Sequence, residues 1–184
     1  GVATEHTAYV NGKDLRVLGD QLGWQGTREV TPLKFKDGEK YTTAEDSTEI
    51  IIDFWYEGDY SAIFKYQPDT NSYLRFTGYD LEGNPIAHKD QETQKQVEVK
   101  NLIVQFVAES PILGDDKNRL EYQLIGSGEG VAFIDGKAIP VTWSKDSRDE
   151  RTLFYDTNGS DMEFNRGKFW ISIVPDRNSH QVVY

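Results

Sequence analysis

The feature that most constrains the fold is a succession of short β-type segments, separated by turn-forming residues, that runs from residue 48 to residue 174. The first segment, 50–56, is a run of β-branched and aromatic residues typical of a buried strand. Segments 60–66 and 73–77 alternate apolar and polar residues, and the turn formers at 68–72 between them predict a β-hairpin. About nine or ten strands at this spacing predict a mainly β fold, α+β overall, built as an antiparallel sheet or a sandwich-like domain.

The second half of the chain repeats this pattern around its longest apolar segment, residues 97–107. The apolar positions shift from odd to even near Asn101, which predicts a β-bulge there. An Asp-Gly pair at 135–136 separates segments 130–134 and 138–143 and predicts a tight hairpin of type I′. The polar tail beyond Pro175 is expected to be loosely held. The remaining predicted strands cover residues 119–125, 154–155, 162–164 and 169–174.

An amphipathic helix is predicted near the amino terminus, over residues 11–24. Asn11 is a suitable N-cap, and Leu15, Leu18 and Leu22 fall on one face. A single helix cannot bury its own apolar face, so these leucines are expected to pack on a sheet or on a lost neighbour.

Charged and turn-forming residues dominate the segment 26–47, where one short strand is expected at 30–35. This segment predicts a connection between two units. Residues 1–45 are interpreted as the remnant of an upstream domain with one helix, and residues 46–184 as an all-β carboxy-terminal domain. The start at Gly1, without an initiator methionine or a leader, predicts a processed or truncated product.

Charge and composition exclude several classes of protein. The formal charge of -11 repels nucleic acid and anionic lipid headgroups, so no nucleic-acid partner is expected. No apolar run has the roughly 18–20 residues that a transmembrane helix needs. The absence of cysteine excludes disulfides, thiolate catalysis and cysteine-ligated metals. No spacing typical of a metal or cofactor site is present, and neither is expected.

Three groups of residues together resemble the carboxy-terminal domain of the YerB-like family of bacterial lipoproteins, a domain of unknown function. The segment around His6, Tyr9 and the predicted helix is similar to the end of the domain that precedes it in the family, so the resemblance covers nearly the whole chain. The groups are Tyr73, Arg75, Phe76, His88, Asp90 and 101–105; then 124–128, Phe133, Gly136 and 143–145; then Thr152, Phe154, Asn158, Gly159, Gly167, Trp170, Ile171 and Val174.

The resemblance implies an extracytoplasmic location. Members of the family begin with a lipoprotein signal and are held at the outer face of the cytoplasmic membrane, which fits the absence of cysteine from this chain. A lipid anchor upstream is therefore implied, although the attachment motif itself is not in this sequence. The resemblance implies no reaction.

Five residues are the candidates for a binding site, and no catalytic residue is assigned. His88 and Asp90 could orient an imidazole, with structural hydrogen bonding as the alternative. Arg75 lies with Tyr73 on an aromatic strand, where a guanidinium can stack on rings or pair with a carboxylate such as Asp90. Asn101 interrupts the longest strand, where its amide would satisfy backbone groups or contact a ligand.

Other motifs are better explained by structure than by chemistry. The glycine-rich segment 126–130 lies between strands and predicts a bend rather than a phosphate loop. Residues 156–161 lack the glutamate of a calcium loop and predict a turn. Trp143 and Trp170 are expected in the core. The acidic residues that could supply a glycosidase pair are Asp53, Glu57, Asp59, Glu121 and Glu129, too many to discriminate.

Two functions are consistent with these observations. The first is a non-catalytic extracytoplasmic module that binds a cell-envelope component or a partner protein. It is favoured because no nucleophile, metal or cofactor motif is found. The alternative is an enzyme that cleaves cell-wall glycan with an acidic residue, which requires a cleft containing a carboxyl group with a raised pKa.

Overall fold

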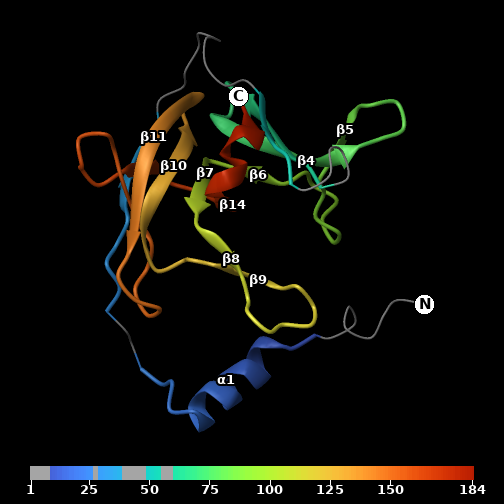
Figure 1. Ribbon diagram of the computed structural model, residues 1–184. Coiled ribbons are helices and arrows are strands. Elements are labelled where there is room, and N and C mark those ends of the chain that lie inside the picture. The colour runs from blue at the N-terminus through green and yellow to red at the C-terminus, as the bar shows by residue number, and fades with distance from the viewer. Residues whose placement is uncertain (1–8, 27–28, 39–48, 55–59) are drawn as a thin grey trace. The chain divides into compact units, whose positions relative to one another are not determined.

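The computed structural model describes residues 9–26, 29–38, 49–54 and 60–184 (Figure 1). The chain divides into two compact units, Gly1–Val30 and Thr31–Tyr184. Among the described residues, the first unit contains the helix α1 (Gly12–Gln21), and the second contains the strands. No described helix is long and apolar enough to cross a membrane.

The predicted amino-terminal helix is confirmed. Asn11 is its N-cap, and the Asn11 side chain accepts a hydrogen bond from the Asp14 backbone N–H at 2.9 Å. Leu15, Leu18 and Leu22 are 48–52% exposed, and the expectation that they pack on another element stays a prediction. The apolar face of α1 therefore contributes nothing to a buried core within the described residues.

The first large sheet has six strands in the order β15-β2-β3-β4-β5, with β6 also paired to β4. The predicted hairpin at its centre is confirmed, with Tyr66 opposite Tyr73 and Phe64 opposite Arg75. Trp55 and Tyr56, which belong to the predicted strand 50–56, lie outside the described residues. The strands are β2 (Glu49–Ile52), β3 (Ala62–Gln67), β4 (Ser72–Tyr79), β5 (Pro85–Ala87), β6 (Glu98–Val99) and β15 (Val182–Val183).

The second large sheet has five strands in the order β12-β11-β10-β7-β14. Its pairs are antiparallel except β14, which runs parallel to β7. Figure 1 shows the long β10–β11 hairpin of this sheet beside β7 and β14. The strands are β7 (Asn101–Val107), β10 (Gly126–Ile134), β11 (Lys137–Lys145), β12 (Leu153–Tyr155) and β14 (Phe169–Pro175).

Two small pairs complete the strands described. β1 (Lys34–Lys36) runs parallel to β13 (Glu163–Asn165), and β8 (Glu109–Pro111) pairs antiparallel with β9 (Leu120–Tyr122). The mainly β prediction is confirmed by this arrangement.

The main core forms where the two large sheets face each other. Phe64 and Tyr73 of the six-stranded sheet are fully buried, as are Leu102, Val104 and Phe133 of the five-stranded sheet, and all five belong to one apolar cluster. The five-stranded sheet also buries its other face, in a second cluster. Because both faces are covered, β7 is apolar along most of its length instead of alternating. The members of the second cluster that are fully or nearly buried are Ile103, Val107, Ala132, Ile134, Val141, Trp143, Phe154, Met162 and Phe164.

The predicted bulge near Asn101 is instead a change of sheet. β6 pairs with β4 in the six-stranded sheet, whereas β7 pairs with β10 and β14 in the other. Lys100 lies between the two strands, and its backbone N–H donates to the Lys168 carbonyl at 3.0 Å. The shift from odd to even apolar positions therefore marks the residue at which the chain turns its buried face toward a different sheet.

The glycine-rich segment is part of a strand and not the predicted bend. β10 begins at Gly126 and pairs with β11 over nine positions. A Cβ at Gly130 would lie 2.6 Å from the Val104 carbonyl oxygen, and one at Gly128 would lie 2.7 Å from Trp143 Nε1. The glycines are therefore required by the close approach of β7 and of the buried indole.

The prediction of a loose carboxy-terminal tail is wrong. After β14 the chain forms the 3-10 helix η2 (Asp176–Gln181) and then β15, which pairs with β2. The Tyr184 ring packs edge-on against Phe133, with 5.0 Å between ring centroids. The tail is held by the apolar contact of Tyr184 and by the hydrogen bonds of β15 to the edge of β2, although its polar composition had suggested that it was mobile.

Gly130→Ala tests the close approach of β7 and β10. The new methyl group would contact backbone, which cannot move without separating the strands, so the free energy of unfolding should fall by about 1–3 kcal/mol. Denaturant unfolding measures this, with the exposed Thr142→Ala on the adjacent strand as a control expected to stay within ~0.5 kcal/mol. Equal stability of the two variants would contradict the predicted strain.

Candidate functional site

Two of the five predicted site residues, Arg75 and His88, come together on β4 and the segment beside it. The Arg75 guanidinium lies over the Trp170 ring, with Cζ 4.3 Å from the ring centroid. His88 contacts the same indole edge-on, and its Nδ1 accepts a hydrogen bond from Arg75 Nη1. The backbones also bond, because the His88 N–H donates to the Arg75 carbonyl at 3.1 Å. Trp170, which was expected in the core, is half-buried beneath this pair.

This pair fixes the protonation state of His88. A guanidinium has only donors, so His88 Nδ1 must be the acceptor and the imidazole must be neutral. Burial lowers the pKa of His88, and the positive charge of Arg75 lowers it further. Burial also lowers the pKa of Arg75. The pair is therefore a cation held between an imidazole and an indole, and not a proton-transfer dyad.

Asp90 takes no part in that pair. Its carboxylate accepts hydrogen bonds from the Thr93 hydroxyl and the Thr93 N–H, each at 2.7 Å, in an exposed turn. The hydroxyl bond, followed by the backbone bond, lowers the pKa of Asp90. Asp90 thus stabilises its own loop, and within the described part of the chain its carboxylate forms no hydrogen bond or ion pair with His88 or Arg75.

Asn101 and Tyr73 belong to a different, buried polar network. The Asn101 side chain accepts from the Asn165 N–H and donates to the Asn165 carbonyl, each at 2.8 Å. The Tyr73 hydroxyl accepts from the Gly136 N–H at 3.0 Å, and burial raises the pKa of Tyr73. Both residues therefore satisfy backbone groups of distant segments. Tyr73 contacts the turn between β10 and β11 directly, and Asn101 is connected to it through Asn165.

Asp135, in that turn, is the centre of the network. The predicted Asp-Gly hairpin is confirmed, because Asp135 and Gly136 both have positive φ, at 58° and 78°. Asp135 Oδ1 accepts from Asn71 Nδ2 at 2.7 Å and from Asn165 Nδ2 at 2.6 Å. Oδ2 forms an ion pair with Lys36 at 2.6 Å. The carboxylate joins three segments that are far apart in sequence.

The hydrogen bonds decide the charge of this carboxyl group. Burial alone raises the pKa of Asp135, but the bonds from Lys36, Asn71 and Asn165 favour the ionised form and together hold the pKa below its usual value. Asp135 is therefore a permanent carboxylate at neutral pH, neutralised by Lys36.

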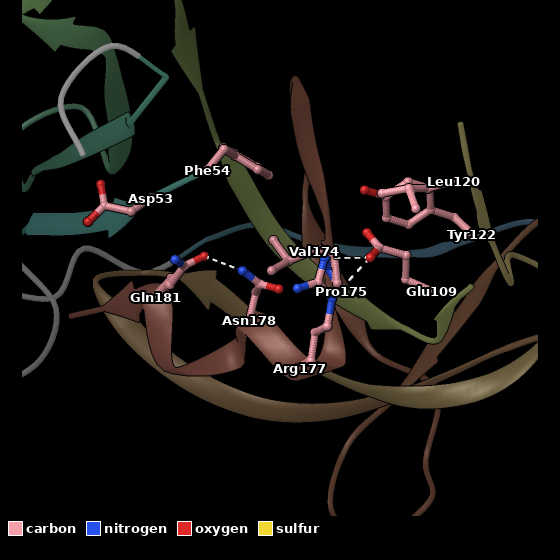
Figure 2. A pocket seen from close by; sticks show the side chains of 10 residues that line it. All are labelled: Asp53, Phe54, Glu109, Leu120, Tyr122, Val174, Pro175, Arg177, Asn178 and Gln181. Carbon is pink, nitrogen blue, oxygen red and sulfur yellow. Dashed lines mark hydrogen bonds and ion pairs between the residues drawn. The ribbon is translucent and has the colours of Figure 1, made fainter. Parts of the chain in front are cut away.

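A separate concave site lies among β2, β14, η2 and the β8–β9 pair. Figure 2 shows Asp53, Phe54 and Gln181 at one side, Glu109, Leu120 and Tyr122 at the other, and Val174 and Pro175 between them. The cavity measures about 160 Å³. Its lining residues are Asp53, Phe54, Glu109, Leu120, Tyr122, Val174, Pro175, Arg177, Asn178 and Gln181, and we call it the Glu109 pocket.

The ordered carboxy-terminal segment supplies one wall of the Glu109 pocket. Arg177 Nε and Nη2 both donate to Glu109 Oε1, at 3.0 and 2.5 Å (Figure 2). Asn178 Nδ2 donates to Gln181 Oε1 at 2.6 Å. The Asn178 Oδ1 atom is buried and has no hydrogen-bond partner among the described residues. The pocket therefore contains an unused acceptor.

Negative charge and acceptors predominate in this pocket. Asp53 and Glu109 contribute two carboxylates against the one guanidinium of Arg177. One Asp53 oxygen accepts from the Ser61 hydroxyl at 2.5 Å. Burial raises the pKa of Tyr122, and its hydrogen bond to Glu109 raises it further. The pocket is suited to a small group that donates hydrogen bonds or carries positive charge.

Sequence reasoning found only Asp53 of this pocket, as one of several acidic residues. Arg177 and Asn178 were missed because the segment after Pro175 was expected to be loose, and Glu109 was not among the acidic residues singled out. A run of six polar residues after a buried strand does contain a signal, since it can form a short helix that folds back. Of the other acidic candidates, Glu57 and Asp59 lie outside the described residues, as does His6. In the described part of the chain no cluster of three metal-ligating side chains occurs.

The fold and these sites define a mainly β domain of two facing sheets, without a recognisable catalytic constellation in its described part. The family model "Protein of unknown function (DUF3048) C-terminal domain" matches residues 50–171, and the chain belongs to this family. The expected YerB-like resemblance is thereby confirmed.

A relative and a solved structure extend the comparison. The chain is 23% identical over 177 residues to "Putative lipoprotein YerB" of Bacillus subtilis (strain 168), covering 96% of this chain and 50% of that protein. The crystal structure of YerB from Bacillus subtilis matches with a TM-score of 0.73 at 22% identity, covering 99% of this chain and 56% of that one. The chain thus spans about half the length of its relative and shares its fold.

Asp135→Asn tests the polar network. The amide keeps the turn conformation but loses the charge facing Lys36, so the free energy of unfolding at neutral pH should fall by about 1–2 kcal/mol. Because folding lowers the pKa of Asp135 from 3.8, its contribution is full above about pH 4 and is lost as pH falls through the folded-state pKa. Unfolding curves of the two proteins should converge in acid. Persistence of the difference at low pH, or an equal loss in exposed Asp116→Asn, would contradict this role.

His88→Gln tests the neutral imidazole. Folding lowers the His88 pKa from 6.5, so its contribution to stability is present above about pH 6.5 and is lost as pH falls through the folded-state pKa. The glutamine oxygen can still accept from Arg75 but does not titrate in this range. The variant should lose less stability than the wild type between about pH 7 and 5 in thermal unfolding. His180→Gln, at an exposed residue of η2, should keep the wild-type slope, and the same slope in all three proteins would refute the assignment.

Proposed function

We propose that this chain is a non-catalytic module that acts outside the cytoplasmic membrane and binds a cell-envelope component through the Glu109 pocket. The observation that carries the proposal is the excess of acceptors and negative charge in a small, partly apolar pocket. The name of the Bacillus subtilis relative, "Putative lipoprotein YerB", supports the location. A lipid anchor and a preceding domain to which residues 1–45 belong are part of the same proposal.

The pocket chemistry favours an amino group as the ligand. The unused Asn178 Oδ1 and the second oxygen of Asp53 can each accept a hydrogen bond from an ammonium. Phe54 and Tyr122 provide aromatic surface, which attracts cations. The formal charge of -11 favours the approach of a positively charged group. Amino groups of cell-wall peptides and amino sugars have this chemistry.

The same pocket supplies one observation in favour of a glycan-cleaving enzyme. Asp53 and Glu109 lie on opposite sides of it, as a pair of catalytic carboxylates would (Figure 2). Glu109 is already held in an ion pair with Arg177, whose Nε and Nη2 both donate to Oε1, so this carboxylate is engaged within the protein. Among the carboxyl groups of the described residues, those with a shifted pKa are Asp80, Asp90, Asp115, Asp135 and Asp156, and in each the pKa is lowered. Binding is therefore the better supported activity.

Co-sedimentation with purified, insoluble peptidoglycan tests the proposal. The wild type should sediment saturably, and Asp53→Asn and Tyr122→Ala should each weaken binding about tenfold, the effect of losing one contact worth ~1.4 kcal/mol. Glu121→Gln removes the same charge as Asp53→Asn from an exposed residue outside the pocket and should bind as the wild type does. Acetylation of the free amino groups of the peptidoglycan should abolish sedimentation.

Three outcomes would count against this function. Absence of binding would exclude peptidoglycan as the component, and binding that ignores Asp53 and Tyr122 would place the site elsewhere. Release of soluble reducing sugar by the wild type, lost in Glu109→Gln, would replace the binding module with the glycan-cleaving enzyme.

A further inference from the structure

A second cavity, of about 290 Å³, lies in front of the Asp135 network. Its lining contains three cations and one carboxylate, in a chain whose acidic residues outnumber the basic ones by 31 to 20. Positive charge is therefore concentrated at this place against the general charge of the molecule. The lining residues are Lys36, Asp37, Gly38, Thr70, Asn71, Lys100, Asn165 and Arg166, and we call it the Lys100 cavity.

Lys100 is the distinctive residue of this cavity. Its ammonium donates to the backbone carbonyl of Thr70, a neutral group, and no carboxylate pairs with it among the described residues. The charge of Lys100 is therefore held in position without being neutralised. An ammonium has three donors, so further N–H groups remain for a ligand.

The other two cations are held by carboxylates. Lys36 pairs with the buried Asp135 at 2.6 Å, and Arg166 Nη1 donates to Asp37 at 2.5 Å. The Arg166–Asp37 pair is exposed, so it contributes little energy and can rearrange around a ligand. Lys36 and Arg166 have donors beyond those that these bonds use. The cavity thus receives cations from three segments. Lys36 belongs to β1, Lys100 lies between β6 and β7, and Arg166 follows β13.

The floor of the Lys100 cavity is fixed before any ligand arrives. Asn71 and Asn165 both donate to Asp135, and Asn165 also bonds to Asn101 through its backbone. A Cβ at Gly167 would lie 2.5 Å from Lys100 Cγ, so the absence of a side chain there makes room for the Lys100 stem. Little conformational entropy would be lost on binding, which favours recognition of a small ion.

We propose that the Lys100 cavity binds a phosphate group, with Lys100 as the principal charge and with Arg166 and Lys36 completing the site. Cations from three segments can each meet a different oxygen of a tetrahedral anion, whereas a carboxylate offers two oxygens. The site uses none of the residues of the Glu109 pocket, so this inference is independent of the proposed function. A phosphate-bearing polymer or a free phosphate metabolite would provide the same group.

Amide chemical shifts during titration with inorganic phosphate test the site, with chloride at equal ionic strength as the reference. Saturable shifts should appear at Thr70, Asn71 and Lys100 and be absent with chloride. Lys100→Gln and Arg166→Gln should each weaken phosphate binding about tenfold, which corresponds to ~1.4 kcal/mol. Lys95→Gln removes the same charge from an exposed turn outside the cavity and should leave the affinity unchanged.

Gly167→Ala gives a variant with unchanged charge. Its methyl group would displace the Lys100 stem, so phosphate affinity should fall although every cation remains. Far-ultraviolet circular dichroism and the spectrum of the free protein show whether each variant is folded. Shifts that do not saturate, that chloride reproduces, or that Lys100→Gln and Lys95→Gln reduce equally would overturn the proposal.

Glycerol 3-phosphate and glycerophosphoglycerol distinguish the sources of the group. Tighter binding of the diester than of inorganic phosphate would assign the site to a polymer backbone, and tighter binding of the monoester would assign it to a terminal or free phosphate. Either result supports the site. Binding of neither compound, at concentrations at which inorganic phosphate is expected to saturate the site, would refute it.

Discussion

The ionised carboxylate of Asp135 is the polar interaction that links the turns of the two sheets beside their apolar core. It lies in a turn of the five-stranded sheet and accepts bonds from Asn71, at the β3–β4 turn of the six-stranded sheet, and from Asn165, at the end of β13. Lys36 of β1 supplies the opposite charge. Four segments thus meet at one anion, and loss of its charge would leave the Lys36 ammonium without its counter-ion.

Local features of the fold could be predicted from the sequence because their causes are local. The Asp-Gly turn requires two residues with positive φ, and the 68–72 hairpin requires turn formers between alternating strands. The Asp135 network could not be predicted, because Asn71 and Lys36 lie 64 and 99 residues away from it. Only the fold brings them together, and nothing in the composition of either segment indicates a partner.

The candidate site likewise combines contacts that could be predicted from nearby residues with contacts that only the fold creates. Arg75 and His88 were chosen from an aromatic strand and a nearby loop, and they do meet, because β5 and the segment after it fold back on β4. Asn101 was given a structural role, and its amide does satisfy backbone groups, but those of Asn165 rather than those of its own strand. The Glu109 pocket was missed because the polarity of its Arg177 wall indicated a mobile tail. Polarity reports contact with water, and not whether a segment is paired.

The pairing of β15 with β2 bears on how the protein avoids self-association through the edge of its six-stranded sheet. A strand at the border of a sheet exposes unpaired N–H and C=O groups that can recruit the same strand of a neighbouring molecule. Val182 and Val183 occupy those groups on β2, beside a fully buried isoleucine pair at 50 and 52. The two-residue strand β15 thereby protects the edge of β2 from pairing with another molecule. Proteolytic trimming of this tail would expose the border of β2 and leave its backbone groups free to pair with a strand of another molecule, which favours aggregation.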